Sequence, residues 1–259
     1  MPLEEYLKIL LIVCPLVFLA GFIDAIAGGG GIISLPAYLL SGLPAHMAYG
    51  CNKFSSLMAC TASTIKYGRT GNIRLKPALC AAVTSLMGAW CGTQLVLRLS
   101  EETFQVMVMV VLPVVAVFLV TRKGFREGVT QEKELTPLQQ VIYPMGVGLL
   151  CGSYDGMVGP GTGTFLILAF TAVMGYNLVT SSGCAKVVNL GSNLGSAIGV
   201  IMAGKVLYTV AIPAAIASGL GSHLGSKTAI KGGAKFIRPT IFLVLGLLFV
   251  KIIYDFFIA

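Results

Sequence analysis

The chain has 259 residues, of which 56% are hydrophobic and 11% are charged, and its formal net charge at pH 7 is +8. So few charges cannot cover the surface of a water-soluble domain, which excludes that class of protein. Several apolar runs approach the roughly 20 residues that a helix needs to cross a bilayer. They are continuous, whereas a membrane β-barrel needs alternating residues. The composition therefore predicts an all-α integral membrane protein with the lipid bilayer as its solvent.

The basic residues gather in three connections between apolar runs, at residues 66–76, 122–133 and 227–238. Lysine and arginine concentrate in the cytoplasmic loops of membrane proteins, so these connections are expected to face the cytoplasm from an inner or plasma membrane. The positive charge gives no indication of nucleic acid as a partner. The acidic N-terminus, MPLEEYLK, precedes an apolar run without a small-residue cleavage site, which predicts a retained first helix.

Ten apolar segments follow one another along the chain. The second and seventh have only 11 and 13 residues, too short to span a bilayer upright at about 1.5 Å per residue. These two are predicted to be re-entrant, or short and tilted inside a shielded bundle. In chain order the segments are 7–27, 32–42, 44–65, 77–97, 103–121, 138–156, 162–174, 177–203, 206–226 and 237–257.

A glycine-rich motif that contains an aspartate occurs twice. Asp24 precedes four consecutive glycines in GFIDAIAGGGGIISLP, at residues 21–36, and Asp155 takes its place in GSYDGMVGPGTGTFL, at residues 152–166. Equivalent residues of the two motifs are 131 positions apart. Further along the chain the offset is 133, so that Lys53 corresponds to Lys186. A nearly constant offset along both halves of the chain predicts an internal duplication. Its parts are a first membrane repeat at 1–121, a cytoplasmic linker at 122–137 and a second repeat at 138–259.

The basic loops are exchanged between the two repeats. Residues 66–76 carry four basic side chains and no acid, whereas their counterpart in the second repeat carries only Lys205. Conversely, residues 98–102 carry one arginine and two glutamates, and their counterpart at 227–238 carries four basic side chains. Equivalent loops are thus expected on opposite sides of the membrane. This pattern predicts inverted-topology repeats, a common plan of transporters.

Two lysines lie deep within apolar segments, about nine or ten residues from the segment start. A charge at that depth faces protein or water and is a functional hypothesis by default. Because Lys53 and Lys186 are repeat equivalents, a pseudo-two-fold axis brings them towards one centre. Two ammonium groups lining one cavity favour a small anionic substrate. The alternative is that each lysine pairs with Asp24 or Asp155 and only fixes the fold.

Each glycine cluster opens a short helix, whose N-terminus offers unpaired N–H groups and a positive dipole end to an anion. Glycine also lets the backbone come close to a ligand. Two threonine hydroxyls are candidate donors beside these groups. The predicted substrate-binding residues of the two motifs are Gly28, Gly29, Gly30, Gly31, Gly159, Gly161, Thr162, Gly163 and Thr164.

Polar side chains surround both lysines at helical spacing, and they either line one face of a cavity or make helix-to-helix contacts. Cys51 and Cys184, each two residues before its lysine, are candidate small neighbours of the cavity, and a direct role with a sulfur-containing substrate is a lesser alternative. Asp24 and Asp155 are predicted to carry coupling protons or ions, or to pair with the lysines while the site is empty. The polar candidates are Asn52, Ser56, Asn189 and Asn193.

No catalytic triad, zinc motif or P-loop is present, so neither an enzyme, a cofactor nor a metal site is predicted. Two other functions remain open. One is a cation or proton-coupled carrier or channel that uses Asp24 and Asp155, and the other is a membrane scaffold without transport. The sequence leaves a homo-oligomer open as well.

Three stretches resemble one family. Residues 21–36, then GLPAHMAYGCNKFSS at 42–56 and K-Y-x-x-x-G-N-I-R at 66–74, are similar to the sulfite exporter TauE/SafE family, and residues 152–166 resemble its second repeat. The resemblance implies an inner-membrane carrier with duplicated halves, associated with the export of sulfite and organic sulfonates. Cys51 stands where the family often has threonine. The sequence thus predicts a secondary transporter that exports small anions, such as sulfite or organosulfonates, by alternating access.

Overall fold

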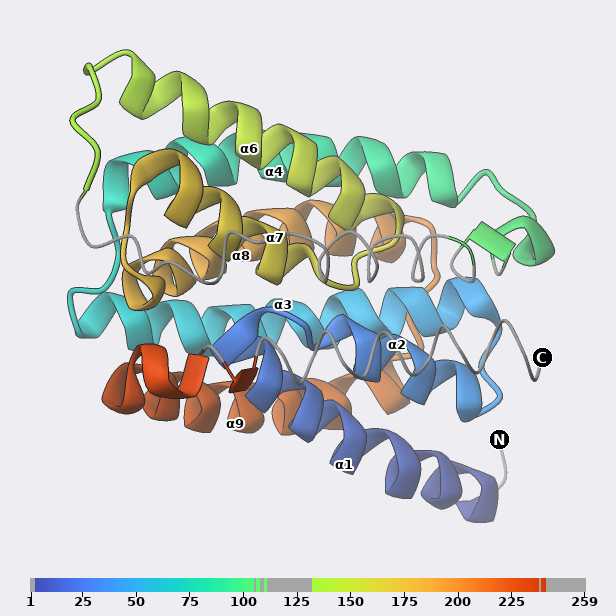
Figure 1. The fold of residues 1–259 in the computed structure, drawn as a ribbon. Coiled ribbons are helices and arrows are strands. Elements are labelled where there is room, and N and C mark those ends of the chain that lie inside the picture. The colour runs from blue at the N-terminus through green and yellow to red at the C-terminus, as the bar shows by residue number, and fades with distance from the viewer. Residues whose placement is uncertain (1–2, 105, 108–109, 111–131, 238, 241–259) are drawn as a thin grey trace.

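The computed structural model describes residues 3–104, 106–107, 110, 132–237 and 239–240 (Figure 1). These residues form helices and contain no strand. Most of the predicted segments 103–121 and 237–257 lies outside the described residues, as do residues 122–131 of the predicted linker. The all-helical prediction is confirmed for the part of the chain that the structure describes.

The described helices follow the predicted segments within six residues at each end, and the largest difference is at the end of α9. Proline, glycine and polar residues separate the apolar runs, and the helices end at these residues. A left-handed glycine, Gly175, ends the π-helical turn η2. The helices are α1 (Leu3–Ala27), α2 (Gly31–Leu40), α3 (Ala45–Arg69), α4 (Leu75–Val96), α6 (Gln139–Met157), α7 (Thr162–Ala169) with η2 (Phe170–Met174), α8 (Leu178–Met202) and α9 (Tyr208–Gly232).

The outer surface of the bundle is apolar. Among the described helices, α1, α4 and α8 are long and apolar enough by themselves to cross a membrane. Large apolar side chains point outward, and Leu11 of α1 and Leu150 of α6 are each 74% exposed. Contiguous exposed apolar surface is unfavourable in water and suits lipid. The structure is therefore that of a membrane protein.

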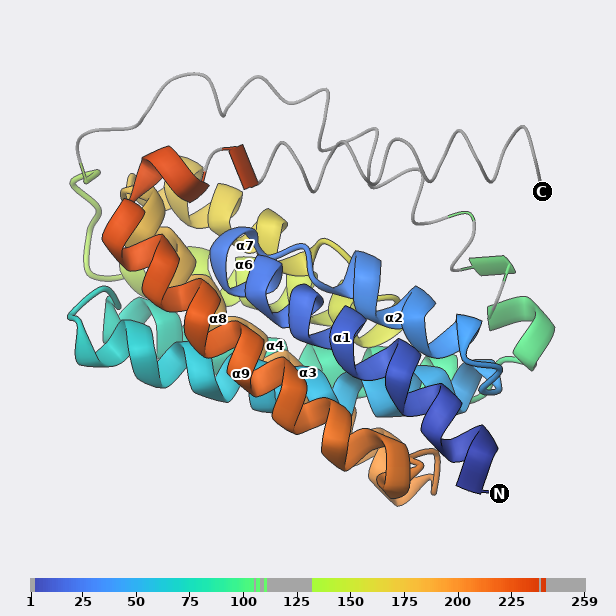
Figure 2. The ribbon, with the colours of Figure 1, turned by 90° about the horizontal axis from the view of Figure 1, so that it is seen from below.

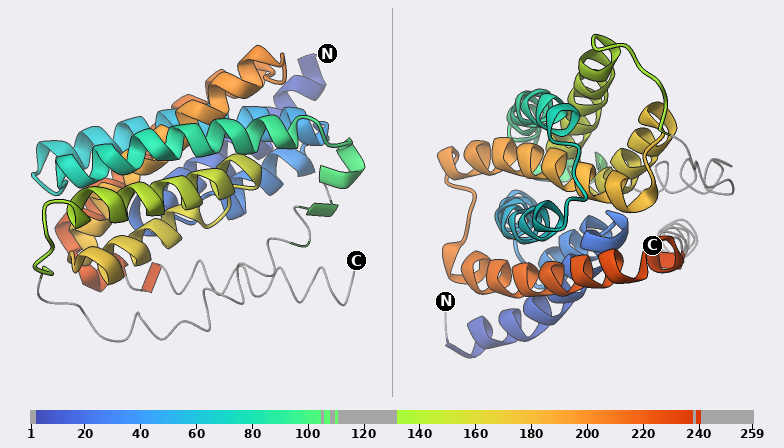
Figure 3. Two further views of the ribbon diagram at one scale, coloured as in Figure 1. Left: turned by 90° about the horizontal axis from the view of Figure 1, so that it is seen from above. Right: turned by 90° about the vertical axis from the view of Figure 1, so that its left-hand side faces the viewer.

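The two central helices are α3 and α8, which pack against each other (Figures 1 and 3). On one side α9 packs on α1 and α3, and on the other side α4 packs on α6 and α8. Glycines allow these close approaches, because a Cβ on Gly21 would overlap the backbone of Ser218, and a Cβ on Gly152 would overlap that of Ser85.

Helices at matching positions in the two halves run in opposite directions (Figures 1 and 2). This holds for α1 and α6, for α3 and α8, and for α4 and α9. As a result the connection between α3 and α4 and the end of α9 lie at the same end of the bundle, on the left in Figure 1. Residues 66–76 and 227–237 therefore gather their basic side chains at one end. Arg74 forms an ion pair there with Glu132, just before α6.

At the other end, His46 in the first turn of α3 holds Glu101. The His46 backbone N–H donates to the carboxylate at 3.1 Å, and ring atom Nδ1 lies 2.6 Å from the other carboxylate oxygen. Partial burial acts to raise the pKa of Glu101, but the hydrogen bonds from His46 outweigh it and lower that pKa below its ordinary value of 4.5. Charged Glu101 is thus favoured in the folded protein.

We expect Glu101→Gln to lower the unfolding temperature at pH 7 and to matter less as the pH falls below about 4.5. A carboxylate with a depressed folded-state pKa stabilises above its unfolded pKa, and this stabilisation is lost as the pH falls through the folded value. The effect is small because the side chain is 44% exposed. Thermal unfolding in detergent from pH 7 to pH 3 measures it, with Glu102→Gln as the control. A difference from wild type that persists unchanged at pH 3 contradicts the argument.

Candidate functional site

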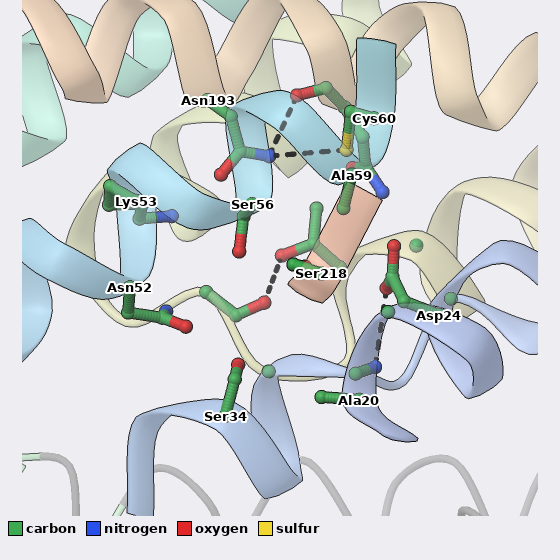
Figure 4. Close-up of a pocket in the computed structure, with 18 of the residues that line it drawn as sticks. Ala20, Asp24, Ser34, Asn52, Lys53, Ser56, Ala59, Cys60, Asn193 and Ser218 are labelled. Carbon is green, nitrogen blue, oxygen red and sulfur yellow. Dashed lines mark hydrogen bonds between the residues drawn. The ribbon is translucent and has the colours of Figure 1, made fainter. Parts of the chain in front are cut away.

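A polar cavity lies in the middle of the bundle, where α1, α2, α3, α6, α7, α8 and α9 meet (Figure 4). Its volume is about 40 Å³, which holds only a few water-sized groups. Thirteen of the predicted site residues line it. They are Asp24, Gly28, Gly30, Gly31, Asn52, Lys53, Ser56, Asp155, Gly159, Thr162, Gly163, Asn189 and Asn193.

Lys53 reaches into this cavity from α3. Its Nζ lies 3.1 Å from Oδ1 of Asp155 and also donates to the backbone carbonyl of Asp155. The side chains of the pair are 2% and 7% exposed. In α3 the lysine is eight residues from the helix start, about 12 Å along the axis. The structure therefore places a buried ion pair between α3 and α6, facing the cavity.

Lys186 forms the second pair, with the aspartate of the other motif. Its Nζ donates to Oδ2 of Asp24 at 2.6 Å, while the other carboxylate oxygen accepts the backbone N–H of Gly30 at 3.2 Å. Lys186 is fully buried and does not line the cavity, whereas Asp24 is 19% exposed and does. The carboxylate of Asp24 thus lies between Lys186 and the cavity, and it also binds the backbone at the N-terminal end of α2.

Each lysine is paired with the aspartate from the other half of the chain. Removing one partner from a buried pair is strongly destabilising, because the remaining charge is left without compensation. Two lysines and two aspartates, when all are ionised, add up to zero charge. The cavity is therefore not electropositive as a whole, and among the described residues the only ammonium group that lines it is that of Lys53.

The two glycine motifs touch at the cavity. Gly28 has a φ of 78°, in the left-handed region, and a Cβ there would overlap the backbone of Gly163. The Thr164 hydroxyl donates to the Ala27 carbonyl at 2.7 Å and ties α7 to the end of α1. Only glycine permits so close a crossing of two backbones. The predicted residues Gly29, Gly161 and Thr164 belong to these motifs without lining the cavity.

Two asparagine side chains in the cavity wall have no hydrogen-bond partner for their amide oxygens in the described part of the chain. These oxygens, of Asn52 and Asn189, are buried and unpaired. Buried polar groups are nearly always paired, so these amide oxygens are available to accept a hydrogen bond from water or from a ligand that carries a donor. Asn193 differs, because its Nδ2 donates to the Asn189 carbonyl at 2.8 Å and lies 3.7 Å from the sulfur of Cys60 (Figure 4).

The two predicted cysteines lie away from the cavity. Cys51 Sγ is 3.8 Å from the carbonyl of Leu207, and Cys184 Sγ accepts the backbone N–H of Arg74 at 3.4 Å. Neither sulfur lines the cavity wall. A residue two positions before another on a helix points about 200° away from it. A cysteine two residues before an inward-facing lysine therefore faces the opposite side.

Six lining residues were not predicted as site residues: Ala20, Gly21, Ser34, Ala59, Cys60 and Ser218. Two signals for Cys60 are present in the sequence. It lies seven residues after Lys53, hence on the same face of α3, and the offset of 133 pairs it with Asn193. Ser34 and Ser218 are single serines in apolar runs, and only the packing of α2 and α9 brings them to the cavity.

Two tyrosines of α3 donate hydrogen bonds to backbone carbonyls at the C-terminal ends of α1 and α6. Tyr67 donates its hydroxyl to the carbonyl of Ala25 at 3.0 Å, and Tyr49 donates to that of Gly156. These are the carbonyls directly after Asp24 and Asp155. The last carbonyls of a helix lack an intrahelical partner, and side chains commonly satisfy them. The two aspartates are thus fixed through their backbones as well as by the lysines.

A charged cavity between broken helices, inside a bundle with an apolar exterior, defines a membrane transporter. The family comparison agrees with this class, since the sulfite exporter TauE/SafE family matches residues 13–252. The chain belongs to this family. Its family and relatives carry the names of transporters, and it is accordingly a transporter and not an enzyme.

Three relatives illustrate the similarity. A probable membrane transporter protein of Sinorhizobium sp, ORF9, is 32% identical over 92% of this chain and 90% of its own length. A probable membrane transporter protein of Haemophilus influenzae is 32% identical over 92% of both chains. The Escherichia coli K12 probable membrane transporter protein YfcA is 29% identical over 92% of this chain and 87% of its own. No solved structure matches this chain significantly.

Proposed function

We propose that the protein is a secondary transporter that exports small anions, of the sulfite or organosulfonate class, through the central cavity. The observation that carries the proposal is the ammonium group of Lys53, buried in the wall of a small polar cavity. A charge-assisted hydrogen bond from an ammonium group is among the strongest contacts that an oxyanion can make. The family's name, sulfite exporter, supports the substrate class.

In the proposed cycle the anion takes the place of Asp155 at Lys53. Asn52 and Asn189 line the cavity, and each carries an amide NH2 group that can donate to the anion and orient it. The backbone N–H groups of Gly31 and Gly163, in the first turns of α2 and α7, face the cavity and can donate to bound substrate. Lys186 acts indirectly, by holding Asp24 in the cavity wall. When the anion leaves, Asp155 returns to Lys53 and resets the site.

Alternating access is supported by matched contacts in the two halves. Gly21 packs on Ser218 and Gly152 packs on Ser85. Gly21 and Gly152 are equivalent at the offset of 131, and Ser85 and Ser218 at the offset of 133. Together with the opposed helix directions, this favours inverted-topology repeats that rock against each other around the cavity. By the positive-inside rule, the end that carries residues 66–76 and 227–237 is cytoplasmic.

The test combines ligand binding with transport. Sulfite, sulfate, thiosulfate, sulfonates and carboxylates are compared for thermal stabilisation of the purified protein. A ligand at 100 times its Kd stabilises the folded state by about 2.7 kcal/mol. We expect sulfite or a sulfonate to stabilise wild type, and Lys53→Ala to lose both this stabilisation and flux in proteoliposomes. Lys205→Ala, outside the cavity, is the control. Normal anion transport by Lys53→Ala refutes the proposal.

One observation favours the second candidate, a cation carrier. Three buried oxygens of the cavity wall lack a hydrogen-bond donor in the described residues: those of Asn52, Asn189 and one carboxylate oxygen of Asp155. Oxygens of this kind suit a cation. Cation flux that depends on Asp24 and Asp155 but is indifferent to Lys53 distinguishes this function from anion transport.

A further inference from the structure

The two aspartates of the cavity are held unequally. Both carboxylate oxygens of Asp24 are bonded, one to the Gly30 N–H and one to Lys186. Asp155 has one oxygen on Lys53, whereas its Oδ2 is buried without a partner in the described chain. A buried carboxylate oxygen without a donor is costly, and a proton on that oxygen removes the charge and supplies a donor group.

The two lysines also differ in the number of acceptors that they have. Lys53 donates to the backbone carbonyl of Asp155 as well as to its side chain, so it keeps an acceptor when that carboxylate becomes neutral. The only acceptor of Lys186 within the described residues is Oδ2 of Asp24. Neutralising Asp24 therefore leaves a fully buried ammonium group with a weakened partner. Of the two pairs, that of Asp155 accepts a proton at the lower cost.

Charge balance adds a third argument, which rests on the proposed function. With both pairs ionised the four side chains sum to zero, so a bound anion leaves one uncompensated negative charge in a buried cavity. Burying an unpaired charge is expensive. An anion that replaces Asp155 at Lys53 also leaves the Asp155 carboxylate without its ammonium partner. One proton on Asp155 removes both penalties.

We propose that Asp155 takes up one proton each time a monovalent anion binds to Lys53, and that the protein thus moves the anion and the proton together. The proton binds to Oδ2 of Asp155, the ion pair with Lys53 is exchanged for one between Lys53 and the anion, and no covalent bond of the substrate changes. The empty and the loaded cavity are both neutral. Asp24 stays ionised throughout.

Few titratable groups of the described chain face Asp155. From α3 these are Lys53, Tyr49, whose hydroxyl binds the adjacent carbonyl of Gly156, and Cys60 in the cavity wall. Its own helix α6 contributes Cys151 and Tyr154. The described residues of α4, α7 and α8 add no ionised side chain in contact with Asp155, and Asp24 of α1, which lines the same cavity, is paired with Lys186. Within these helices Lys53 is therefore the one charge in direct contact with it, and the anion competes for that charge.

The experiment uses the full chain in proteoliposomes, with radiolabelled sulfite and methanesulfonate as probes. Methanesulfonate is chosen for counting protons, since it has no group that titrates near neutral pH. A trapped pH indicator is expected to report about one proton per methanesulfonate. A gradient of one pH unit is expected to change the final accumulation of methanesulfonate about tenfold, and an imposed membrane potential to leave that accumulation unchanged.

Variants assign the proton to one carboxylate. Asp155→Asn is expected to exchange labelled for unlabelled anion while net flux no longer responds to a pH gradient. Asp24→Asn, the matched change in the other pair, is expected to lower flux but to keep the response to the pH gradient. Should Asp155→Asn fail to fold, the proton count of wild type still decides whether coupling exists.

The outcomes separate this inference from the proposed function. If neither probe moves above the background of protein-free liposomes, the proposed function is overturned. If anions move without protons, or together with sodium instead, anion transport stands and proton coupling is refuted. A pH response that survives in Asp155→Asn and disappears in Asp24→Asn refutes the assignment to Asp155.

Discussion

Replacing Asp24 with alanine is expected to destabilise the protein by about 3–5 kcal/mol, because it leaves the ammonium group of Lys186 buried without a counter-charge. Lys186 is 0% exposed and has no other acceptor in the described residues. The substitution also removes the acceptor of the Gly30 N–H at the start of α2. Denaturant or thermal unfolding in detergent micelles measures the loss.

The double variant Asp24→Ala, Lys186→Met is expected to recover much of that stability, since it removes both charges together. A double-mutant cycle then isolates the pair from the loss of the Gly30 contact. The exposed pair of Lys8 and Glu4, at the N-terminal end of α1, is the control. Lys8→Met is expected to leave stability almost unchanged. A double variant no more stable than Asp24→Ala contradicts the account of a buried pair.

Flux through the double variant separates two interpretations of the charges. If the pair only fixes the fold, a variant that regains its stability also regains transport. If Asp24 shapes the cavity wall, as its position there indicates, transport stays impaired although the protein is folded. The anion that stabilises wild type serves as the readout, because binding to the cavity is measured apart from unfolding itself.

The fold was largely predictable because lipid-facing apolar runs and their polar breaks record helix length directly. The predicted segments 32–42 and 162–174, for example, correspond to α2 at Gly31–Leu40 and to α7 with η2 at Thr162–Met174. Helix pairing was not predictable in the same way. Sequence spacing places a lysine on a helix, but only the packing of α3 on α8 determines which aspartate it meets.

The site was predicted in its residue types and less well in its geometry. Lysine in an apolar segment is rare enough to single out Lys53 and Lys186, and both take part in buried pairs. The symmetric prediction missed that only Lys53 lines the cavity while Lys186 lies behind Asp24. A duplicated sequence pattern leaves room for such differences, since side chains in each half pack against non-identical neighbours.

Replacing Gly28 with alanine is expected to have the second large effect, a loss of roughly 2–5 kcal/mol together with loss of transport. Two costs combine here. Alanine in a left-handed conformation costs about 1–2 kcal/mol, and Gly28 has a φ of 78°. The new Cβ also overlaps the Gly163 backbone, and overpacking of this kind costs about 1–3 kcal/mol.

Gly42→Ala is the matched control, because it carries the first cost without the second. Gly42 has a φ of 84°, and no atom lies within 4 Å of the position that its new Cβ would take. The difference in unfolding free energy between the two variants thus measures the cost of the close contact between the two glycine motifs.

The close contact between the motifs also has a functional consequence. Gly163 lies close to Asn189, because a Cβ built on Gly163 would be 2.9 Å from Nδ2 of Asn189. A displaced Gly163 therefore pushes against this side chain. Anion binding is expected to weaken in Gly28→Ala and to persist in Gly42→Ala. Equal losses in both variants would show that the close approach of the two glycine motifs is not what shapes the cavity.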